Sequence, residues 1–459
     1  MKIEMQRKFV LMLTFTLILF IVFAPNIIRA DEVDDYVKEQ IRRQRIPGLS
    51  LAIVKNGAVF KTAGYGLANI ELNAAASPET VYQSGSIGKQ FTAAAVMLLV
   101  EDGKINLDDS IEKYFTDTPE SWKKITIRHL LTHTSGILNI PPTEINYRLD
   151  YTDEEIVKKA FAQPLAFASG ESWSYSNTAY ILLGIIIKKA TGKFYGDFLR
   201  ERIFKPLGMN SSRVISESDI VSNRAAGYKI VKGELKNQEY VSPSLNRTAD
   251  GTLYLTVGDL AKWDAALSAG KLFKKTSLEQ MFTPVKLNGG KTYSYGFGWF
   301  INNVRGHSLI EHGGGWQGFT SHIARYTDDK LTIIVLTNIF AADVSGIAHG
   351  IAEIYIPELR RTAINLDPQT LAVYAGQYEL APNLILTVKI ESGKLFLQMG
   401  NRSEELFAES ETKFFLKAVD AQITFVKDEK GQASKLILHQ NGANIEARKI
   451  RLQNAFSGN

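Results

Sequence analysis

The sequence contains no cysteine among its 459 residues. Structural disulfides and lipid attachment through a cysteine are therefore excluded, and the fold must be stabilised by core packing alone. Long runs of lysine and arginine are also missing, because the basic residues behind the formal net charge of +5 are scattered among acidic ones. This distribution gives no basis for a nucleic-acid-binding surface. We find neither an internal repeat nor a low-complexity segment, so the chain has an ordinary globular composition, with room for two or three domains.

The N-terminus departs from this composition. Three basic residues precede an almost uninterrupted apolar run over residues 9–24, and Pro25 and Ala30 follow it. This layout predicts a secretory signal peptide over residues 1–30, removed after Ala30, and hence an exported protein, periplasmic or extracellular. The alternative is an uncleaved membrane anchor, because the apolar run is close to the roughly 17 residues that a short span needs. In either case the membrane is contacted only through this segment.

The pattern of strand-like and helical segments over residues 31–360 predicts one domain of the α/β class, more narrowly α+β. Asn56-Gly57 stands between two strand-like runs, 49–54 and 58–66, and is a strong hairpin signal. An antiparallel sheet flanked by helices is expected, with the helical middle of the domain as an insertion beside it. Further strand-like runs that would complete the sheet lie at residues 296–303, 318–326 and 331–338.

Residues 361–459 have a different pattern. Short alternating strands are separated by turns such as Glu391-Ser-Gly-Lys and Asn441-Gly. This pattern predicts a separate small all-β barrel or sandwich at the C-terminus.

Ser86 and Lys89 form a Ser-x-x-Lys pair at the start of an apolar helix-forming segment, residues 86–101. A serine hydroxyl needs a base within hydrogen-bond reach, and a lysine can serve if burial lowers its pKa. Positions i and i+3 share a helix face, and the apolar segment would bury the ammonium. Solvated polar residues are the simpler interpretation of the same spacing in charged or turn-like sequence, at Ser110-Lys113, Ser121-Lys124, Ser268-Lys271 and Ser410-Lys413.

Tyr175-Ser-Asn177 is the only Tyr-x-Asn in the chain. A phenol can relay protons between the serine and a leaving group, and the asparagine can orient the lysine and the substrate carbonyl. The tripeptide alone is common in structural loops. Its weight comes from the accompanying Ser86 and Lys89.

His312-Gly-Gly314-Gly315 precedes the strands that close the predicted sheet. Glycines let a strand edge approach a substrate and present N–H groups, while the histidine can donate to a carbonyl or carboxylate. Gly313, Gly315 and Gly318 also spell Gly-x-Gly-x-x-Gly, but strand-like sequence rather than a helix follows, which argues against dinucleotide binding.

His129 and His133 stand four residues apart, as in half of a zinc site. The glutamate of the zinc motif is replaced by Leu130 and no further ligand cluster is evident, so packing or capping is the preferred role. The sequence implies neither a metal nor an organic cofactor, and it contains no P-loop.

Taken in order, Ser86-Ile-Gly-Lys89, Tyr175-Ser-Asn177 and His312-Gly-Gly314 resemble the motifs of the serine β-lactamase and penicillin-binding-protein superfamily. Within it the match is to the class C β-lactamase-like branch, which includes esterases, D-aminopeptidases and D-alanyl-D-alanine carboxypeptidases. Between the motifs, family-like strings include Ile127–Gly136, Ile203–Met209, Ala249–Leu260 and Tyr295–Trp299.

The resemblance implies a role for each residue. Ser86 would be acylated, Lys89 and Tyr175 would share proton transfer, and Asn177 would help to position the substrate. The backbone N–H groups of Ser86 and Gly315 would form the oxyanion hole beside Gly314. The C-terminal domain is similar to the lipocalin-like domains of some of these hydrolases, for which self-association or shielding of the site is expected.

One departure bears on the substrate. Where β-lactamases of this branch carry Lys-Thr-Gly, this chain has His312-Gly-Gly314, and a histidine is mostly neutral at pH 7. We therefore expect an esterase or D-amino acid peptidase acting on a small molecule or peptide. A β-lactamase or cell-wall D-Ala-D-Ala carboxypeptidase is the first alternative, and a catalytically silent peptide-binding protein is the second.

Overall fold

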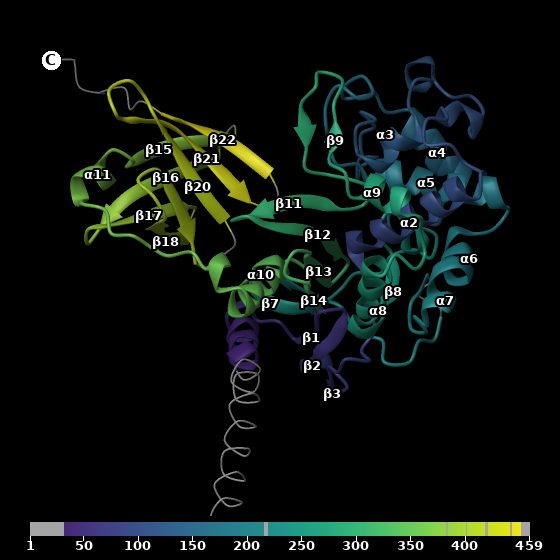
Figure 1. The fold of residues 1–459 in the computed structure, drawn as a ribbon, viewed down its shortest axis with the longest axis horizontal. Coiled ribbons are helices and arrows are strands. Elements are labelled where there is room, and N and C mark those ends of the chain that lie inside the picture. Colours follow the sequence, from purple (N-terminus) through teal and green to yellow (C-terminus); the bar gives the residue numbers. More distant parts are fainter. Residues whose placement is uncertain are drawn as a thin grey trace, which may run out of the picture. The chain divides into compact units, whose positions relative to one another are not determined.

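The computed structural model describes residues 32–214, 219–381, 384–400, 402–417, 421–440 and 443–450 (Figure 1). The predicted signal peptide, residues 1–30, lies outside the described residues. None of the described helices combines the length and the apolar character of a membrane span. The chain divides into two compact units, the first ending at Pro357 and the second beginning at Glu358, each with its own hydrophobic core.

An antiparallel sheet of seven strands forms the centre of the first unit. Its strand order is β11-β12-β13-β14-β1-β2-β3, so strands from the two ends of the unit lie side by side, which confirms the expected sheet. The predicted hairpin joins β1 and β2, and Asn56 and Gly57 have positive φ angles of 53° and 76°, as a tight turn requires. The strands are β1 (Gly48–Lys55), β2 (Ala58–Asn69), β3 (Ala74–Ala75), β11 (Phe300–Val304), β12 (His307–Trp316), β13 (Phe319–Tyr326) and β14 (Leu331–Thr337).

Helices cover both faces of this sheet. Side chains alternate along β13, so that Arg325 bonds to Asp264 of α8 (Val257–Ser268), whereas Tyr326 lies near His349 of α10 (Val344–Tyr355). Figure 1 shows α8 and α10 on opposite sides of β13 and β14. Because both faces are covered, β1 and β14 are buried along almost their whole length.

Between β3 and β11 more residues lie in helices than in strands, as expected for the helical middle of the domain. Its central helix is α2 (Gly88–Glu101), which is buried from Gly88 to Leu99 and is followed by Gly103 with a φ of 70°. Phe91 of α2 packs on Trp263, with 4.7 Å between ring centroids. The other helices of this part are α3 (Ile127–Leu131), α4 (Asp153–Phe161), α5 (Asn177–Thr191), α6 (Tyr195–Leu199), α7 (Lys205–Leu207), α8 and α9 (Lys275–Met281).

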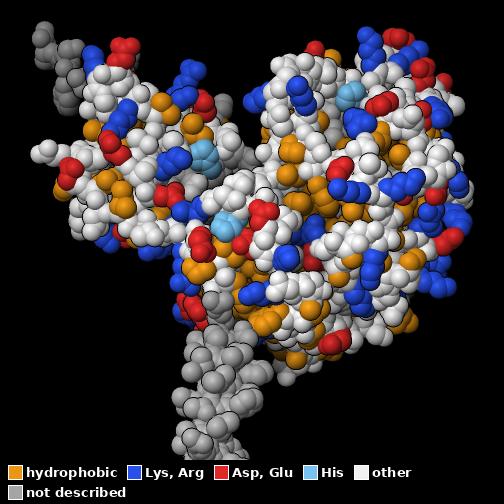
Figure 2. All heavy atoms as spheres, viewed as in Figure 1, with side chains coloured by type: hydrophobic (Ala, Val, Ile, Leu, Met, Phe, Trp, Pro, Cys, Tyr) orange, Lys and Arg blue, Asp and Glu red, His pale blue; other side chains and the backbone are white. Residues whose placement is uncertain are grey.

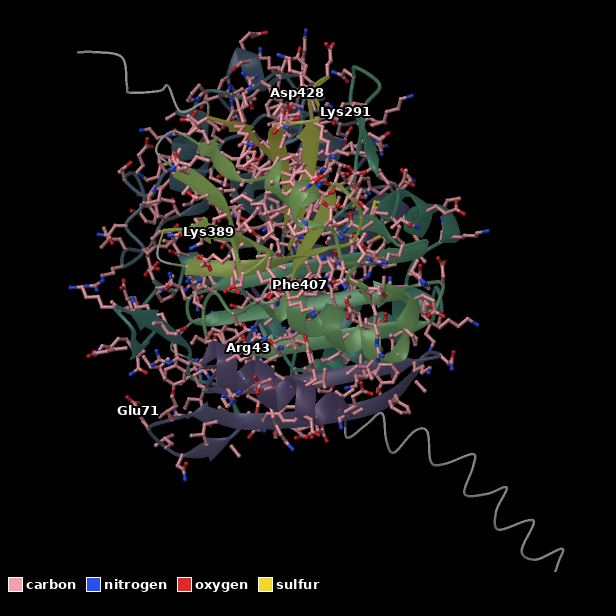
Figure 3. The ribbon with its side chains drawn as sticks, turned by 90° about the vertical axis from the view of Figure 1, so that its left-hand side faces the viewer. Arg43, Glu71, Lys291, Lys389, Phe407 and Asp428 are labelled. Carbon is pink, nitrogen blue, oxygen red and sulfur yellow. The ribbon has the colours of Figure 1, made fainter. Side chains whose placement is uncertain are left out.

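The second unit is a closed antiparallel barrel of eight strands, which confirms the predicted small all-β domain. Tyr374 and Phe425 stack in its core with 4.5 Å between ring centroids. On β18, Leu406 and Ala408 are buried, while Phe407 between them, labelled in Figure 3, faces outward. The strands are β15 (Gly376–Ala381), β16 (Leu384–Glu391), β17 (Lys394–Met399), β18 (Arg402–Ala408), β19 (Lys413–Leu416), β20 (Ala421–Lys427), β21 (Ala433–Gln440) and β22 (Ala443–Lys449), preceded by α11 (Pro368–Ala372).

Charged side chains of both signs are interspersed on the face shown in Figure 2. Figure 3 labels two exposed examples in the first unit, Arg43 on the helix of residues 32–44 and Glu71 between β2 and β3. The charges therefore form a mixed surface on these faces rather than a field of one sign.

Candidate active site

The serine and the lysine of the Ser-x-x-Lys pair meet at the start of α2. Ser86 lies in the 3-10 turn η1 (Gly85–Ile87), and Lys89 lies in the first turn of α2 directly after it. Lys89 Nζ and Ser86 Oγ are 3.1 Å apart. The sequence spacing has therefore placed an amine within hydrogen-bond reach of the candidate nucleophile.

Lys89 is completely buried. Its Nζ contacts two further oxygens, Asn177 Oδ1 at 2.8 Å and the backbone oxygen of Asp250 at 2.5 Å. The aromatic rings of Tyr175 and Tyr180 lie 4.8 Å and 5.5 Å from it. The amine is therefore held by three oxygens, lies beside two aromatic rings and is shielded from bulk solvent.

Burial lowers the pKa of Lys89 to about 8, against the opposing effect of the Asp250 charge. A neutral amine has two N–H groups and one lone pair. The carbonyl oxygens of Asn177 and Asp250 accept the two N–H groups, which leaves the lone pair for the hydroxyl of Ser86. The neutral form of Lys89 is thus oriented as a base toward Ser86.

Tyr175 and Asn177 are brought to this pair by the start of α5. Ser176 is the N-cap and its side chain accepts from Ala179 N, so Asn177 is the first residue of the helix. Asn139 Oδ1 accepts a hydrogen bond of 2.7 Å from the backbone N–H of Asn177. This cap fixes the loop that carries both Tyr175 and the Asn177 amide.

The hydroxyl of Tyr175 is buried and has no hydrogen-bond partner among the described residues. Burial raises the pKa of this phenol above its ordinary value, although the nearby Ser86 hydroxyl acts in the opposite direction. The phenol is therefore protonated at neutral pH. Tyr175 is suited to give a proton, whereas Lys89 is suited to take one.

Gly314 and Gly315 bring β12 against the turn that carries Ser86. A Cβ on Gly314 would lie 2.1 Å from Ser84 O and 2.8 Å from Ser86 N, and only glycine allows such an approach. Gly85, with a φ of 53°, faces the strand in the same way, since its Cβ would lie 2.4 Å from Gly315 N. The backbones around Ser86 N and Gly315 N are therefore in close contact, as a pair of oxyanion-hole donors requires.

His312 lies on the same face of β12 as Gly314 and is 2% exposed. Both of its ring nitrogens have partners: Nε2 lies 3.1 Å from Tyr295 Oη, and Nδ1 lies 2.6 Å from Gly313 O. Burial, together with the nearby Lys89 charge, lowers the pKa of His312 to about 3. The ring is neutral and held by the protein.

Hydrogen bonds link His133, whose ring packs on Tyr175, to Tyr295 and His312, and one assignment of donors and acceptors satisfies all of them. The backbone N–H of Ser176 donates to His133 Nδ1 at 3.1 Å, so the proton of a neutral His133 is on Nε2. That group donates to Tyr295 Oη at 3.2 Å, and Tyr295 in turn donates to His312 Nε2. His312 then donates from Nδ1 to Gly313 O. We call this set, running from Ser176 through His133, Tyr295 and His312 to Gly313, the buried relay.

The histidine pair at four-residue spacing has the packing and capping roles preferred from the sequence. His129 accepts from the backbone N–H of Thr126 at 3.1 Å and completes a capping box at the start of α3. His133 is buried with its ring 4.3 Å from that of Tyr175, measured between centroids.

Three residues that contribute to the site were not predicted from the sequence. Tyr295 and Asp250 lie inside family-like strings, but a side chain joining two histidines and a backbone oxygen binding an amine leave no local pattern. Asn139, which holds Asn177, stands in a loop without any signal at all.

A cleft of about 490 Å³ opens next to the end of β12 that carries Gly315. Tyr147 in its wall packs against Trp316, the last residue of β12, with 6.1 Å between ring centroids. Aromatic side chains and charged side chains of both signs line it, including Tyr147, Arg148, Tyr151, Glu239 and Tyr240, together with Gln317.

The fold and these motifs define a class of protein, the serine hydrolases with the fold of β-lactamases and penicillin-binding proteins. Residues 33–356 match the family model described as Beta-lactamase, and the chain belongs to this family. Residues 360–454 match a second model, described as a domain of unknown function (DUF3471).

Individual relatives agree with this assignment. The chain is 30% identical to penicillin-binding protein 4* of Bacillus subtilis (strain 168) over 432 residues, which cover 86% of this chain and 94% of that protein. An octameric penicillin-binding protein homologue from Pyrococcus abyssi superposes with a TM-score of 0.65 at 28% identity, over 91% of this chain and 100% of that one. D-amino acid amidase from Ochrobactrum anthropi SV3 superposes with a TM-score of 0.61 at 27% identity, over 72% and 97%.

Proposed function

We propose that this protein is an exported serine hydrolase that cleaves an amide or an ester through an acyl-enzyme on Ser86. The observation that carries the proposal is the buried Lys89 amine, 3.1 Å from Ser86 Oγ and with its other hydrogen-bonding capacity taken by two carbonyl oxygens. The lone pair of such an amine is left to accept the proton of the Ser86 hydroxyl.

In the first step neutral Lys89 takes the proton of Ser86 while Oγ bonds to the substrate carbonyl carbon. The π electrons of the carbonyl move onto its oxygen, and the N–H groups of Ser86 and Gly315 stabilise the resulting charge. Asn177 orients the amine and the substrate. The product of this step is a tetrahedral intermediate on Ser86 with a protonated Lys89.

Collapse of the intermediate breaks the bond to the amine or alcohol. Tyr175 gives its proton to this leaving group, and the proton on Lys89 passes to the Tyr175 oxygen, so the acyl-enzyme carries the resting protonation state. Water then attacks the acyl carbon by the same route, with Lys89 and Tyr175 again moving the proton. Hydrolysis restores the Ser86 hydroxyl and releases the acid.

The substrate class follows from what faces the site. His312 stands where β-lactamases of the class C-like branch carry a lysine, and a neutral histidine supplies no cation for the carboxylate of a β-lactam. The likeness to a D-amino acid amidase supports D-amino acid amides or peptides, with small esters as the other members of the class. The likeness to penicillin-binding protein 4* favours the alternative, a D-Ala-D-Ala carboxypeptidase or β-lactamase.

A substrate panel tests the proposal. Wild-type protein and Ser86→Ala are assayed on D-amino acid amides, D-alanyl peptides, short-chain p-nitrophenyl esters and nitrocefin. We expect turnover of amides or esters by the wild type, at rates above those on nitrocefin, and none by Ser86→Ala. Turnover that persists in Ser86→Ala would contradict the nucleophile, and absence of turnover on every compound would favour the catalytically silent peptide-binding protein.

Export and self-association extend the proposal. The order of basic, apolar and small residues in positions 1–30 supports a signal peptide that is removed after Ala30, and N-terminal sequencing of the exported protein is expected to begin at Asp31. The octameric state of the Pyrococcus abyssi homologue supports self-association, for which the C-terminal barrel is the candidate surface. Light scattering of the full chain and of a chain ending at Pro357 tests this role.

A further inference from the structure

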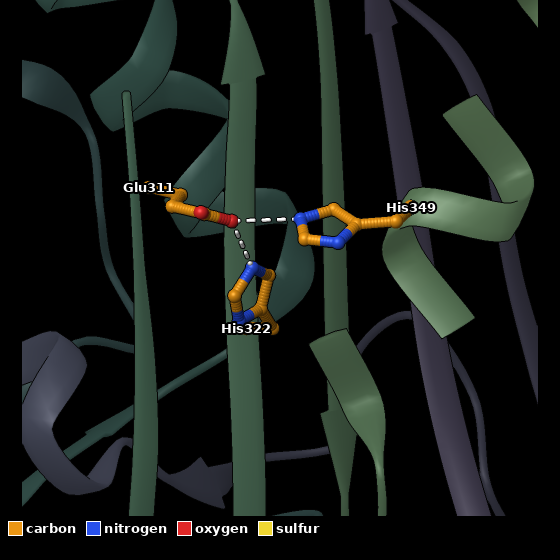
Figure 4. Close-up of side chains that lie close together, drawn as sticks. All are labelled: Glu311, His322 and His349. Carbon is orange, nitrogen blue, oxygen red and sulfur yellow. Dashed lines mark hydrogen bonds and ion pairs between the residues drawn. The ribbon is translucent and has the colours of Figure 1, made fainter. Parts of the chain in front are cut away.

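A cluster of metal-ligand side chains lies on the sheet face opposite the buried relay. Alternation along β12 points His312 and Gly314 toward Ser86, and Glu311 therefore points to the other face. His322 of β13 pairs with Gly313, which places it on the same face as Glu311. His349 reaches this point from α10, which covers that face. Figure 4 shows the three side chains converging from these elements.

The three side chains meet through their terminal atoms. Glu311 Oε2 lies 3.0 Å from His322 Nε2 and 2.7 Å from His349 Nε2, and one potential ligand atom from each residue lies within 4.8 Å of the others. The side chains are 12%, 6% and 20% exposed, in the order Glu311, His322 and His349. The cluster is thus largely enclosed, and His349 is its most exposed member.

Neighbouring residues orient the ligand atoms. Asn302 Nδ2 donates to the second carboxylate oxygen, Glu311 Oε1, at 2.9 Å, and leaves Oε2 for the histidines. Gly313 makes room for His322, because a Cβ at that position would lie 3.3 Å from His322 Nδ1. Gly313 therefore gives space to His322 in this cluster, whereas Gly314 allows the close approach to Ser84 and Ser86 on the other face.

We propose that Glu311, His322 and His349 bind one divalent cation of the Zn²⁺ type. Two imidazoles and one carboxylate form a ligand set that such cations favour, whereas Mg²⁺ and Ca²⁺ prefer oxygen ligands alone. With bonds of about 2.0–2.1 Å, tetrahedral ligand atoms lie roughly 3.3 Å apart, so binding requires only small movements of the two rings. In a tetrahedral site of this kind the fourth ligand would be water.

The proposed cation would join three elements of the first unit. β12 and β13 supply one ligand each, and α10, the last long helix of the unit, supplies the third. Because the ligands face away from Ser86, we assign the cation a stabilising role: it ties α10 to the strand that carries Gly314 and Gly315. The serine mechanism requires no metal in this arrangement, so the two sites can be tested separately.

Zinc binding to the full chain tests the site. Protein is stripped with EDTA, dialysed, and titrated with Zn²⁺ by calorimetry, with native mass spectrometry for stoichiometry and Co²⁺ for the visible absorption of a four-coordinate site. We expect one ion per chain and a rise in melting temperature on Zn²⁺ addition. The absence of cysteine removes thiolate binding as a competing source of these signals.

Variants separate a metal site from a hydrogen-bonded cluster. Glu311→Gln keeps the shape and an accepting oxygen but loses the charge, and His349→Ala removes the most exposed ligand. Each is expected to weaken Zn²⁺ binding at least about 100-fold, and Asn302→Ala about 10–100-fold, as for an orienting neighbour. The matched control is His307→Ala, a histidine as exposed as His349 and paired with Asp329 at 2.8 Å, which is expected to bind as wild type.

Two results would overturn the proposal. One is the absence of stoichiometric Zn²⁺ binding by the stripped wild type, which would leave the cluster as a hydrogen-bonded brace. The other is binding by Glu311→Gln and His349→Ala that equals wild type, or that falls no further than in His307→Ala. Circular dichroism of each variant verifies that the comparison is made between folded chains.

Discussion

The two units of this protein bury different kinds of side chain. In the first unit the buried set includes a lysine, three histidines and the Arg325–Asp264 ion pair, in which Nε and Oδ1 are 2.6 Å apart. In the described part of the second unit all of the buried residues are apolar or tyrosine. A buried charge costs free energy unless it is paired or hydrogen-bonded, so a fold keeps one where it serves a purpose.

This difference in buried side chains indicates that the chemistry takes place in the first unit. The barrel has the composition expected of packing alone, whereas the first unit maintains Lys89 in surroundings that disfavour its charged form. Groups with pKa values shifted in this way concentrate at functional sites. Loss of a barrel side chain should therefore cost stability, whereas loss of Lys89 or of its partner Ser86 should cost activity.

The largest expected effect is on turnover after removal of the serine or the lysine. Ser86→Ala and Lys89→Ala should each lower kcat/KM by about 10⁴-fold or more, and the double variant should retain the same residual rate, because residues that act as one unit give non-additive losses. Lys113→Ala is the matched control, since its lysine also follows a serine by three residues but is 58% exposed. Steady-state kinetics measures all four, and clearly additive losses would separate Lys89 from Ser86.

The barrel should respond in stability instead. Phe425→Ala removes a core ring that stacks on Tyr374 and should lower the free energy of unfolding of the barrel by about 3–5 kcal/mol, with kcat unchanged while the chain is folded. Phe407→Ala, on the outer face of β18, is the control with a smaller loss. Thermal and urea unfolding measure the difference, and a fall in kcat of the folded variant would remove the distinction between the units.

Lys89 should also make the free energy of unfolding depend on pH. Its pKa is about 8 in the folded protein and about 10.5 in the unfolded chain, so between these values the unfolded state binds more protons. Stability of the wild type relative to Lys89→Met should therefore rise from pH 8 to 10.5, by about 3 kcal/mol in total. Urea titrations of both proteins give the difference. Parallel curves would mean that the amine is not desolvated.

The smallest effect concerns the buried relay. Tyr295→Phe removes two hydrogen bonds, one to His133 Nε2 and one to His312 Nε2, each contributing roughly 0.5–1.5 kcal/mol, and we expect kcat to fall about tenfold. Tyr295 acts here by positioning the rings behind Tyr175. Tyr293→Phe is the control, because Tyr293 is a half-buried tyrosine that stacks on Trp173, with 4.0 Å between ring centroids, and is not part of the buried relay. A change in KM alone would contradict the positioning role.

Much of the architecture could be predicted from the sequence. Asn56-Gly57 marked the hairpin, and the apolar run after Ser86 marked a buried helix, since both depend on local chain geometry. The period-two patterning with frequent turns indicated a small all-β domain, a barrel or a sandwich, and the structure shows that it is a closed barrel. The hydrogen bonds from Lys89 to Asp250 O and to Asn177 could not be predicted from the sequence, because the bonded residues are 161 and 88 positions apart.

The surroundings of His312 show the limit most clearly. Its place in the motif indicated a donor to substrate, whereas the structure gives both ring nitrogens protein partners, one of them Tyr295. The Glu311, His322 and His349 cluster was equally hidden, since its residues come from two strands and a helix and match no spaced motif. Tertiary contacts of this kind leave no periodic pattern in the chain.

The rate at which a fluorophosphonate labels Ser86, followed from pH 6 to pH 10, tests the central claim most directly, because labelling requires only the nucleophile and its base. The rate should rise with a single proton loss of midpoint about 8, the pKa of Lys89, and Lys89→Arg should show no labelling at any pH in this range. A rate in the wild type that does not change with pH, or a midpoint above 10, would show that an ordinary lysine stands beside the serine and would contradict the mechanism.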